Sequence, residues 1–357
     1  MHSIVELSGA DYLEMFALHR LHEELSLQHG IVAAFVDFGG VDLSGVDLGG
    51  VDLGGVDLSG VDGSPRRLAD HSAEFATVPC IIVATNCAPA STTTDLCDVA
   101  LDDDEVVRFG ADLRSSITSN PLAATALAVH LRGADTRTVH QGLVAESVTY
   151  SLLQSGPEFA RWLTGRGNPF GGFAPTDEAV VVDRTGDRLV IELNRPERHN
   201  AFSRDMRDAF VSALSIALMD EEVTQIDVSG RGRSFCSGGD LAEFGTFASP
   251  IASHLTRLTR SPAWLLAQLA DHTTVHLHGA CYGAGIELAA FVKDVAASSN
   301  ARICLPEIGL GLIPGAGGTA SIPRRIGRHR TALLGLSGSE IDASTALAWG
   351  LIDRIED

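Results

Sequence analysis

The sequence predicts an α/β protein with a mostly helical region ahead of its main body. From about residue 178, short apolar strand patterns alternate with helical patterns, which is typical of layered α/β structures. Before that point, helical periodicity dominates several stretches. Glycines and prolines concentrate in residues 156–177 and indicate a boundary between the two parts.

Composition limits the classes of function. The chain has 357 residues, of which 45% are hydrophobic and 20% charged, as in ordinary globular proteins. Its formal net charge of −20 argues against a nucleic-acid partner, which would need a basic face. Lys293 is the only lysine, so any phosphate clamp would have to be built from arginine.

The cysteines and the N-terminus indicate a cytoplasmic protein. None of the six cysteines forms a C-x-x-C pair or a zinc-like spacing, so we expect reduced, buried thiols and no metal site. Residues 1–30 lack the basic start and apolar stretch of a signal peptide. No apolar run approaches the length that spans a membrane.

Three segments precede the main body. Residues 1–35 are predicted to be an N-terminal helical segment because apolar side chains share a helical face within 11–29. Residues 36–62 repeat a Val-Asp-Leu-Gly-Gly pentad that resembles pentapeptide-repeat proteins. We expect a flexible linker there, with a small folded coil as the alternative.

Residues 78–177 regain globular character. Val78–Ala84 is strand-like, and helical patterns follow at 104–117, 121–132 and 140–154.

The main body covers residues 178–357. Two strand patterns around 179–193 read as a hairpin with Thr-Gly-Asp in its turn. A helix is expected at 203–219, strands at 225–229 and 274–278, and further helices near 285–293 and 330–348.

Two glutamates stand beside glycine clusters in this body. Glu287 follows Gly283–Gly285, and Glu307 precedes the Gly315–Gly318 run. Small residues let backbone N–H groups approach a ligand oxygen, and helices that begin there add partial positive charge. Two carboxylates beside free N–H groups suit proton transfer next to an enolate.

Four motifs together resemble the crotonase superfamily. They are Leu193–Phe202, Ser234–Leu241, His278–Ala289 and Leu305–Thr319, and they occur in the family's order within the 178–357 body. The resemblance implies a spiral of ββα units and an acyl-CoA thioester substrate, with coenzyme A entering as part of the substrate and no separate cofactor. It also implies a homo-oligomer.

Matching by motif position implies roles for individual residues. The amides of Gly239 and Ala284 would stabilise the thioester enolate. Ser237, Gly239 and Leu241 would line the adenine and pantetheine path, with Gly283 and Gly315 clearing space for the substrate. Arg195 and Arg198 are candidates to meet the CoA phosphates, with a solvated turn as the alternative.

The two glutamates favour enoyl-CoA hydratase chemistry, because family hydratases carry glutamate at both positions. By the same resemblance, Glu307 is the acid/base at Cα and Glu287 orients and activates the water. Alternatives are another crotonase reaction (isomerisation, thioester hydrolysis or cofactor-free oxygenation) and a non-catalytic scaffold.

The family's helical tail is expected at an unusual place. Relatives usually continue beyond the position that matches Asp357, and residues 95–170 resemble that continuation. We expect this segment to dock on the 178–357 body of its own or a neighbouring subunit, with Phe159, Trp162, Leu163 and Phe170 as apolar anchors. An unrelated helical domain is the alternative.

Overall fold

The chain divides into two compact units, residues 1–133 and 134–357. The computed structural model describes residues 2–17, 20–39, 75–87, 96–167, 178–247 and 249–356. The unit boundary falls inside the segment 78–177, which the sequence indicated as one region. That prediction is therefore corrected: its strand and first two helices belong to the first unit, and its later helices belong to the second.

The first unit contains a parallel sheet with the order β1-β2-β3-β4, formed by Ser3–Ser8, Ile31–Asp37, Ile81–Thr85 and Val99–Ala100. Helices α1 (Gly9–Ala17) and α2 (Leu21–Glu24) and the 3-10 turn η1 (Leu27–His29) lie between β1 and β2. The purely helical segment predicted over 1–35 is thus wrong in part. Residues 32–36 form a continuous buried run, as expected for a strand covered on both faces.

Helices α4 (Asp103–Ser119) and α5 (Pro121–Leu131) follow this sheet, close to the predicted ranges. A capping box between Asp102 and Glu105 starts α4, and Pro121 at the first position starts α5. The predicted linker 36–62 lies outside the described residues beyond Gly39.

The second unit has two sheets, which form a crotonase-like spiral of ββα units. Within the described residues, the larger sheet has the order β13-β10-β8-β7-β6-β5, and only the β5–β6 pair is antiparallel. The strands are Val180–Thr185, Arg188–Leu193, Gln225–Gly230, Thr273–Leu277, Asp294–Ser298 and Arg354–Glu356, from β5 to β13 in chain order. The smaller sheet has the order β12-β11-β9, formed by Ile341–Asp342, Arg302–Cys304 and Ala280–Tyr282.

Two repeats place one strand in each sheet and then a helix. Strands β8 and β9 lead into α11 (Ala284–Ala289), and β10 and β11 lead through η7 (Glu307–Leu310) into α12 (Gly318–Ser337). The helix predicted at 330–348 is wrong in its continuity: α12 ends at Ser337, and its cap residue Gly338 has a φ of 63°, which suits glycine. A separate helix, α13 (Ala343–Trp349), follows.

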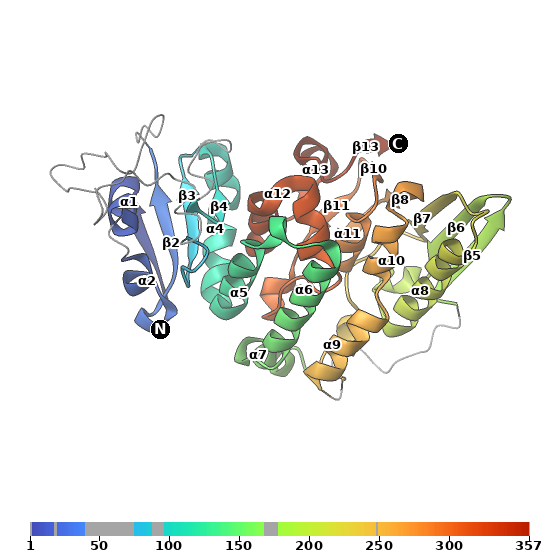
Figure 1. The fold of residues 1–357 in the computed structure, drawn as a ribbon, viewed down its shortest axis with the longest axis horizontal. Coiled ribbons are helices and arrows are strands. Elements are labelled where there is room, and N and C mark those ends of the chain that lie inside the picture. Colours follow the sequence, from blue (N-terminus) through green and yellow to red (C-terminus); the bar gives the residue numbers. More distant parts are fainter. Residues whose placement is uncertain are drawn as a thin grey trace. The chain divides into compact units, whose positions relative to one another are not determined.

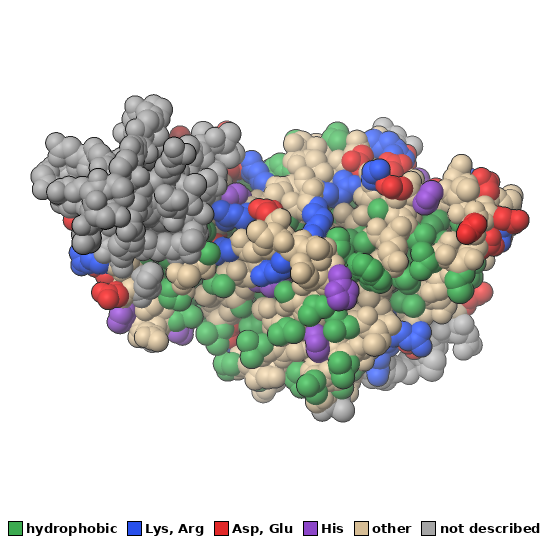
Figure 2. All heavy atoms as spheres, viewed as in Figure 1, with side chains coloured by type: hydrophobic (Ala, Val, Ile, Leu, Met, Phe, Trp, Pro, Cys, Tyr) green, Lys and Arg blue, Asp and Glu red, His purple; other side chains and the backbone are tan. Residues whose placement is uncertain are grey.

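Helices α8 (Arg204–Met219), α9 (Pro250–Thr259) and α10 (Pro262–Gln268) complete the body. Short 3-10 turns stand between these elements: η3 (Ala134–Thr136), η4 (Pro196–Arg198), η5 (Leu241–Glu243) and η6 (Ala270–His272). Acidic side chains gather around the β5–β6 hairpin on the face drawn in Figure 2.

The helices α6 (Val139–Gln154) and α7 (Pro157–Gly165) pack on this body, as expected for the later part of segment 95–170. The earlier part of that segment, up to residue 133, belongs to the first unit instead. Figure 1 shows α6 beside α9 and α12, and both contacts occur in the structure. Phe159 is buried, stacks on Trp162, and Trp162 meets Phe244 edge-on. Leu163 packs against Gly245, where an added Cβ would lie 2.8 Å from Leu163 Cδ2. The fourth predicted anchor, Phe170, lies outside the described residues.

Two further expectations concern thiols and membranes. All six cysteines are buried, as predicted. Among the described helices, none combines the length and the apolar character needed to cross a membrane.

Candidate active site

Glu287 lies on α11 with its side chain almost wholly buried. Its Oε2 accepts hydrogen bonds from the Ala316 N–H at 2.7 Å and the Gly318 N–H at 2.9 Å. The glycine run is needed here, because a Cβ on Gly318 would stand 2.6 Å from Glu287 Cγ. The start of α12 therefore closes directly over this carboxylate.

Glu307 opens the turn η7 that follows β11. The residue as a whole is partly exposed, but Oε2 is buried and has no hydrogen-bond partner among the described residues. A Cβ on Gly283 would lie 2.4 Å from Glu307 Oε1, so the carboxylate rests against the turn that begins α11. Glu307 thus keeps one oxygen available for chemistry.

A third carboxylate, Glu146 of α6, joins the two predicted ones. Its Oε1 accepts the Gly317 N–H at 2.7 Å, and Oε2 accepts the Thr319 N–H at 2.8 Å and the Thr319 hydroxyl at 2.7 Å. Successive amides of residues 316–319 therefore alternate between Glu287 and Glu146. Glu146 lies outside every motif in the sequence, and the one signal for it is an acidic residue on the helical face that it shares with Leu143 and Tyr150.

The three carboxylates favour the protonated state. Burial, followed by the charges of Glu307 and Glu146, raises the pKa of Glu287 well above its ordinary value, against the lowering effect of its two amide bonds. Burial, with a smaller contribution from Glu146, raises the pKa of Glu307 to about 8. Burial likewise raises the pKa of Glu146 to about 7, opposed by its bonds to Thr319 and Gly317 and by Arg257. The cluster therefore holds at least one proton at neutral pH.

Two backbone amides near this cluster have no acceptor. Within the described residues, neither the Gly239 N–H nor the Ala284 N–H donates a hydrogen bond. The backbone segments that carry these amides lie side by side. Cys236 and Cys281 pair in an isolated parallel β-bridge, and the Tyr282 N–H donates to the Cys236 carbonyl at 2.9 Å. A Cβ on Gly238 would lie 3.2 Å from the Tyr282 carbonyl oxygen, so the close approach needs glycine.

Arg195 is placed differently from the expectation of a phosphate contact. Its side chain is buried, donates to the Ala201 carbonyl at 2.6 Å and pairs with Asp240 at 3.0 Å. This arrangement fixes the loop before Leu241 and leaves no exposed fork for a phosphate. Arg198 is half-buried on η4, and Ser237 is half-buried with its N–H bonded to the His199 carbonyl.

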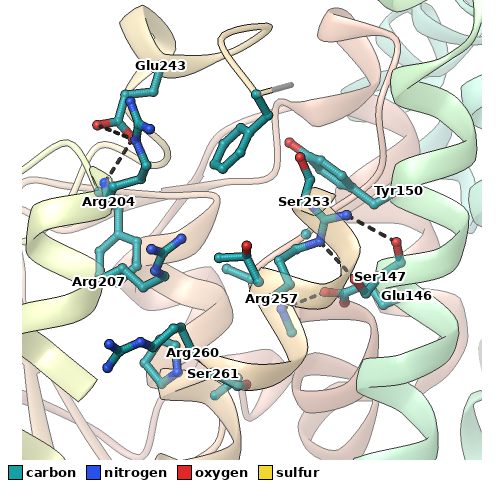
Figure 3. A pocket seen from close by; sticks show the side chains of 18 of the residues that line it. Glu146, Ser147, Tyr150, Arg204, Arg207, Glu243, Ser253, Arg257, Arg260 and Ser261 are labelled. Carbon is teal, nitrogen blue, oxygen red and sulfur yellow. Dashed lines mark hydrogen bonds and ion pairs between the residues drawn. The ribbon is translucent and has the colours of Figure 1, made fainter. Parts of the chain in front are cut away.

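A cavity of about 170 Å³ opens beside the three-carboxylate cluster. Its walls come from α6, the start of α8, η5, α9, α10 and the 315–317 loop (Figure 3). Of the predicted site residues, Gly315 lines it; Glu287 and Glu307 do not. Ala316, which donates to Glu287, and Glu146 form the wall nearest the carboxylates. A Cβ on Gly315 would clash with the Tyr150 ring at 2.4 Å, so Tyr150 of α6 packs directly on this loop.

Comparison with known proteins identifies the family. A family model described as enoyl-CoA hydratase/isomerase matches residues 186–356, and one for pentapeptide repeats matches residues 34–62. The chain is 34% identical to the 2,3-dehydroadipyl-CoA hydratase of Escherichia coli K12, covering 49% of this chain and 68% of that protein. It is 32% identical to the 1,2-epoxyphenylacetyl-CoA isomerase of the same organism, covering 47% and 66%. A crystal structure of a Mycobacterium smegmatis enoyl-CoA hydratase matches with 27% identity and a TM-score of 0.47, covering 50% of this chain and 70% of that one.

These matches define a member of the crotonase superfamily. More narrowly, the chain belongs to the enoyl-CoA hydratase/isomerase family, and this membership implies an acyl-CoA thioester as its substrate. The chain spans about two thirds of the length of the curated relatives it matches. The relatives include both hydratases and an isomerase, so the family alone does not define one reaction.

Proposed function

We propose that the protein is an enoyl-CoA hydratase that adds water across the 2,3 double bond of a 2-enoyl-CoA thioester. One observation carries the proposal: Glu287 and Glu307 are two buried carboxylates with raised pKa values, supplied by successive ββα units. Hydration needs a base to activate water and an acid to protonate Cα, and a coupled carboxyl pair supplies both.

In the proposed reaction the ionised carboxylate takes a proton from a water molecule while the oxygen of that water forms a bond to Cβ. The π electrons move to the thioester carbonyl to form an enolate, and the protonated carboxyl then delivers its proton to Cα. We assign water activation to Glu287, whose Oε2 is anchored by two amides, and proton transfer at Cα to Glu307, whose Oε2 has no partner among the described residues.

The enolate oxygen would be held by the Gly239 and Ala284 amides, because both N–H groups lack an acceptor in the described part of the chain. Such preorganised donors stabilise charge that develops in the transition state. The unmatched amides and the carboxyl pair occupy adjoining segments, which supports an enolate intermediate.

The test is the loss of ultraviolet absorbance of the conjugated enoyl thioester, followed with crotonyl-CoA and longer 2-enoyl-CoA substrates. We expect wild-type protein to remove the absorbance and Glu307→Gln to slow it by about 10²-fold or more, because the substitution deletes the proton donor. Glu197→Gln, at an exposed position on η4, is the matched control and should retain activity. Absence of turnover by wild type on every 2-enoyl-CoA that it binds would exclude the hydratase function.

Double-bond isomerisation is the second candidate, because the matching family model is described as covering both enoyl-CoA hydratases and isomerases. Isomerisation moves one proton between carbons and needs no activated water. Glu287→Gln separates the two: a hydratase loses activity, whereas an isomerase that uses Glu307 alone continues to move the double bond.

A further inference from the structure

Helix α6 presents a polar stripe to the cavity. Glu146, Ser147, Tyr150 and Gln154 line it at spacings of one, three and four residues, so they share one helical face. Opposite them, α8, α9 and α10 contribute more hydroxyl groups, from Ser203, Ser253, Thr256 and Ser261. The cavity surface as a whole is mostly apolar, as expected for a site that takes an acyl chain, so the polar groups on α6 would contact one polar part of a ligand.

Arg257 of α9 is the central charge on this wall. Its Nε donates to the Ser147 hydroxyl at 2.9 Å, and Nη2 donates to the Ser147 carbonyl at 3.2 Å and to the Ser151 hydroxyl. The guanidinium also lies 4.6 Å from the centre of the Tyr150 ring. Every one of these partners is neutral, and no described carboxylate forms an ion pair with Arg257. Figure 3 shows the side chain reaching from α9 toward Ser147.

A half-buried cation held only by neutral groups is costly unless an anion joins it. Burial lowers the pKa of Arg257, with the neighbouring Tyr150 and Glu146 opposing the effect. Glu146 does not serve as the direct partner, because both its oxygens are taken by Gly317 and Thr319. Arg257 lines the cavity, and within the described residues its Nη1 has no hydrogen bond.

The rest of the cavity is also positive. Arg204, Arg207 and Arg260 line it on the side opposite α6 (Figure 3). Of the acidic lining residues, Asp240 is paired with Arg195 and Glu243 with Arg204. Among the described residues, Arg207 and Arg260 have one acidic partner between them, Asp208, which lies outside the lining. On a chain with a net charge of −20, this concentration of arginine marks an anion site.

Gln154, at the far end of the polar stripe on α6, adds a polar group without a hydrogen-bond partner among the described residues. This group is its buried Oε1 atom. A side-chain amide can present either its oxygen or its NH2 group to a ligand. A hydrocarbon chain would leave this amide unsatisfied, whereas a polar acyl terminus would not.

We propose that the cavity receives the acyl group of the substrate and that Arg257 binds a carboxylate at the far end of that group. The preferred substrate class is therefore a short 2-enoyl-CoA whose acyl chain ends in a second carboxylate. This inference rests on the proposed function, because it places the acyl group beside the carboxylates that would act on it.

The geometry of α6 limits the length of the acyl chain. Glu146 lies at the catalytic end, and Ser147 and Ser151, which hold Arg257, lie within the next turn and a half. At about 1.5 Å per residue this is an axial distance of about 2–8 Å. A few carbon atoms cover that distance, so acids of about four to six carbons fit better than long chains.

Binding and turnover test the inference separately. Dissociation constants are measured by calorimetry for hexanoyl-CoA and for its analogue with a carboxylate at C6. Both are saturated and cannot be hydrated, so their binding is independent of the hydratase proposal. We expect the carboxylate analogue to bind at least about tenfold more tightly, as for a charged hydrogen bond in a sheltered site. The same pair of acyl groups as 2-enoyl thioesters then gives the ratio of kcat/KM.

The variant Arg257→Met should remove the preference by weakening the carboxylate analogue about tenfold while changing hexanoyl-CoA less than about threefold. Arg257→Lys keeps the positive charge and should retain part of the preference for the carboxylate analogue. Arg184→Gln, in an exposed ion pair on β5, is the control. A repeat with 3′-dephospho-CoA thioesters separates an acyl carboxylate from a CoA phosphate: the preference for the C6 carboxylate should persist without the 3′-phosphate.

Equal or tighter binding of hexanoyl-CoA by wild type would overturn the proposal even if no Arg257 variant folds. An equal loss for both ligands in Arg257→Met would assign Arg257 to CoA binding or to structure instead. A clear preference in binding with no hydration would leave the carboxylate site standing and exclude the hydratase reaction.

Discussion

Glu146 holds the 316–319 loop in place together with Glu287. It holds the 317 and 319 amides, while Glu287 holds the 316 and 318 amides. Glutamine at this position could accept with one oxygen only, and its NH2 group would face a backbone donor. The loop that anchors Glu287 would then lose the hydrogen bonds made to one of the two Glu146 oxygens.

We therefore expect Glu146→Gln to lower kcat by about tenfold and to move the alkaline limb of the pH–rate profile to lower pH. The shift follows because the Glu146 charge raises the pKa of both Glu287 and Glu307, and the amide removes that charge. A merely structural role would lower kcat without moving the limb. The measurement is kcat/KM from about pH 6 to pH 10, with Glu197→Gln as the control.

The contact between α6 and α12 depends on a glycine. A Cβ on Gly142 would lie 2.9 Å from the Ala320 Cβ, closer than real side chains approach. We expect Gly142→Ala to destabilise the protein by about 1–3 kcal/mol, because the helices must separate to admit the methyl group. It should also weaken the Glu146–Thr319 bonds and so reduce activity.

Gly165→Ala is the matched control for this contact, because nothing lies within 4 Å of the added methyl at the end of α7. Alanine there should be neutral or stabilising by up to about 1 kcal/mol. Urea unfolding of both variants provides the comparison. Equal stability of the two would contradict the close packing of α6 on α12.

Local patterns predicted most elements of the second unit, and the motifs brought Glu287, Glu307, Gly239 and Ala284 to one region. Residues from distant elements were harder to predict. Glu146 and Arg257 reach the site only because α6 and α9 pack together, and nothing local in the sequence encodes that contact. Arg195 was misjudged for the opposite reason: its partner Asp240 lies 45 residues away, and the pair is buried only in the folded chain. Similarly, strands β1 and β2 are separated by helical sequence, so only their pairing marks them as a sheet.

For the whole molecule, the buried carboxyl cluster makes the stability of the fold depend on pH. Folding raises the pKa of Glu307 from 4.5 to about 8, so the folded state favours its protonated form. The resulting stability is complete below about pH 4.5 and is lost as the pH rises through about 8, where the buried group must ionise. Glutamine resembles the protonated form at every pH and avoids this loss.

Glu307→Gln should therefore raise the Tm relative to wild type at pH 9 by a few degrees and much less at pH 5.5, since about 1 kcal/mol corresponds to roughly 2–4 °C in a protein of this size. Thermal unfolding of both proteins at the two pH values measures the difference. The exposed Glu197→Gln should show no such dependence. A Tm gap that is the same at both pH values, or larger at pH 5.5, would mean that Glu307 is not held protonated by folding. The acid role assigned to it would then lack its physical basis.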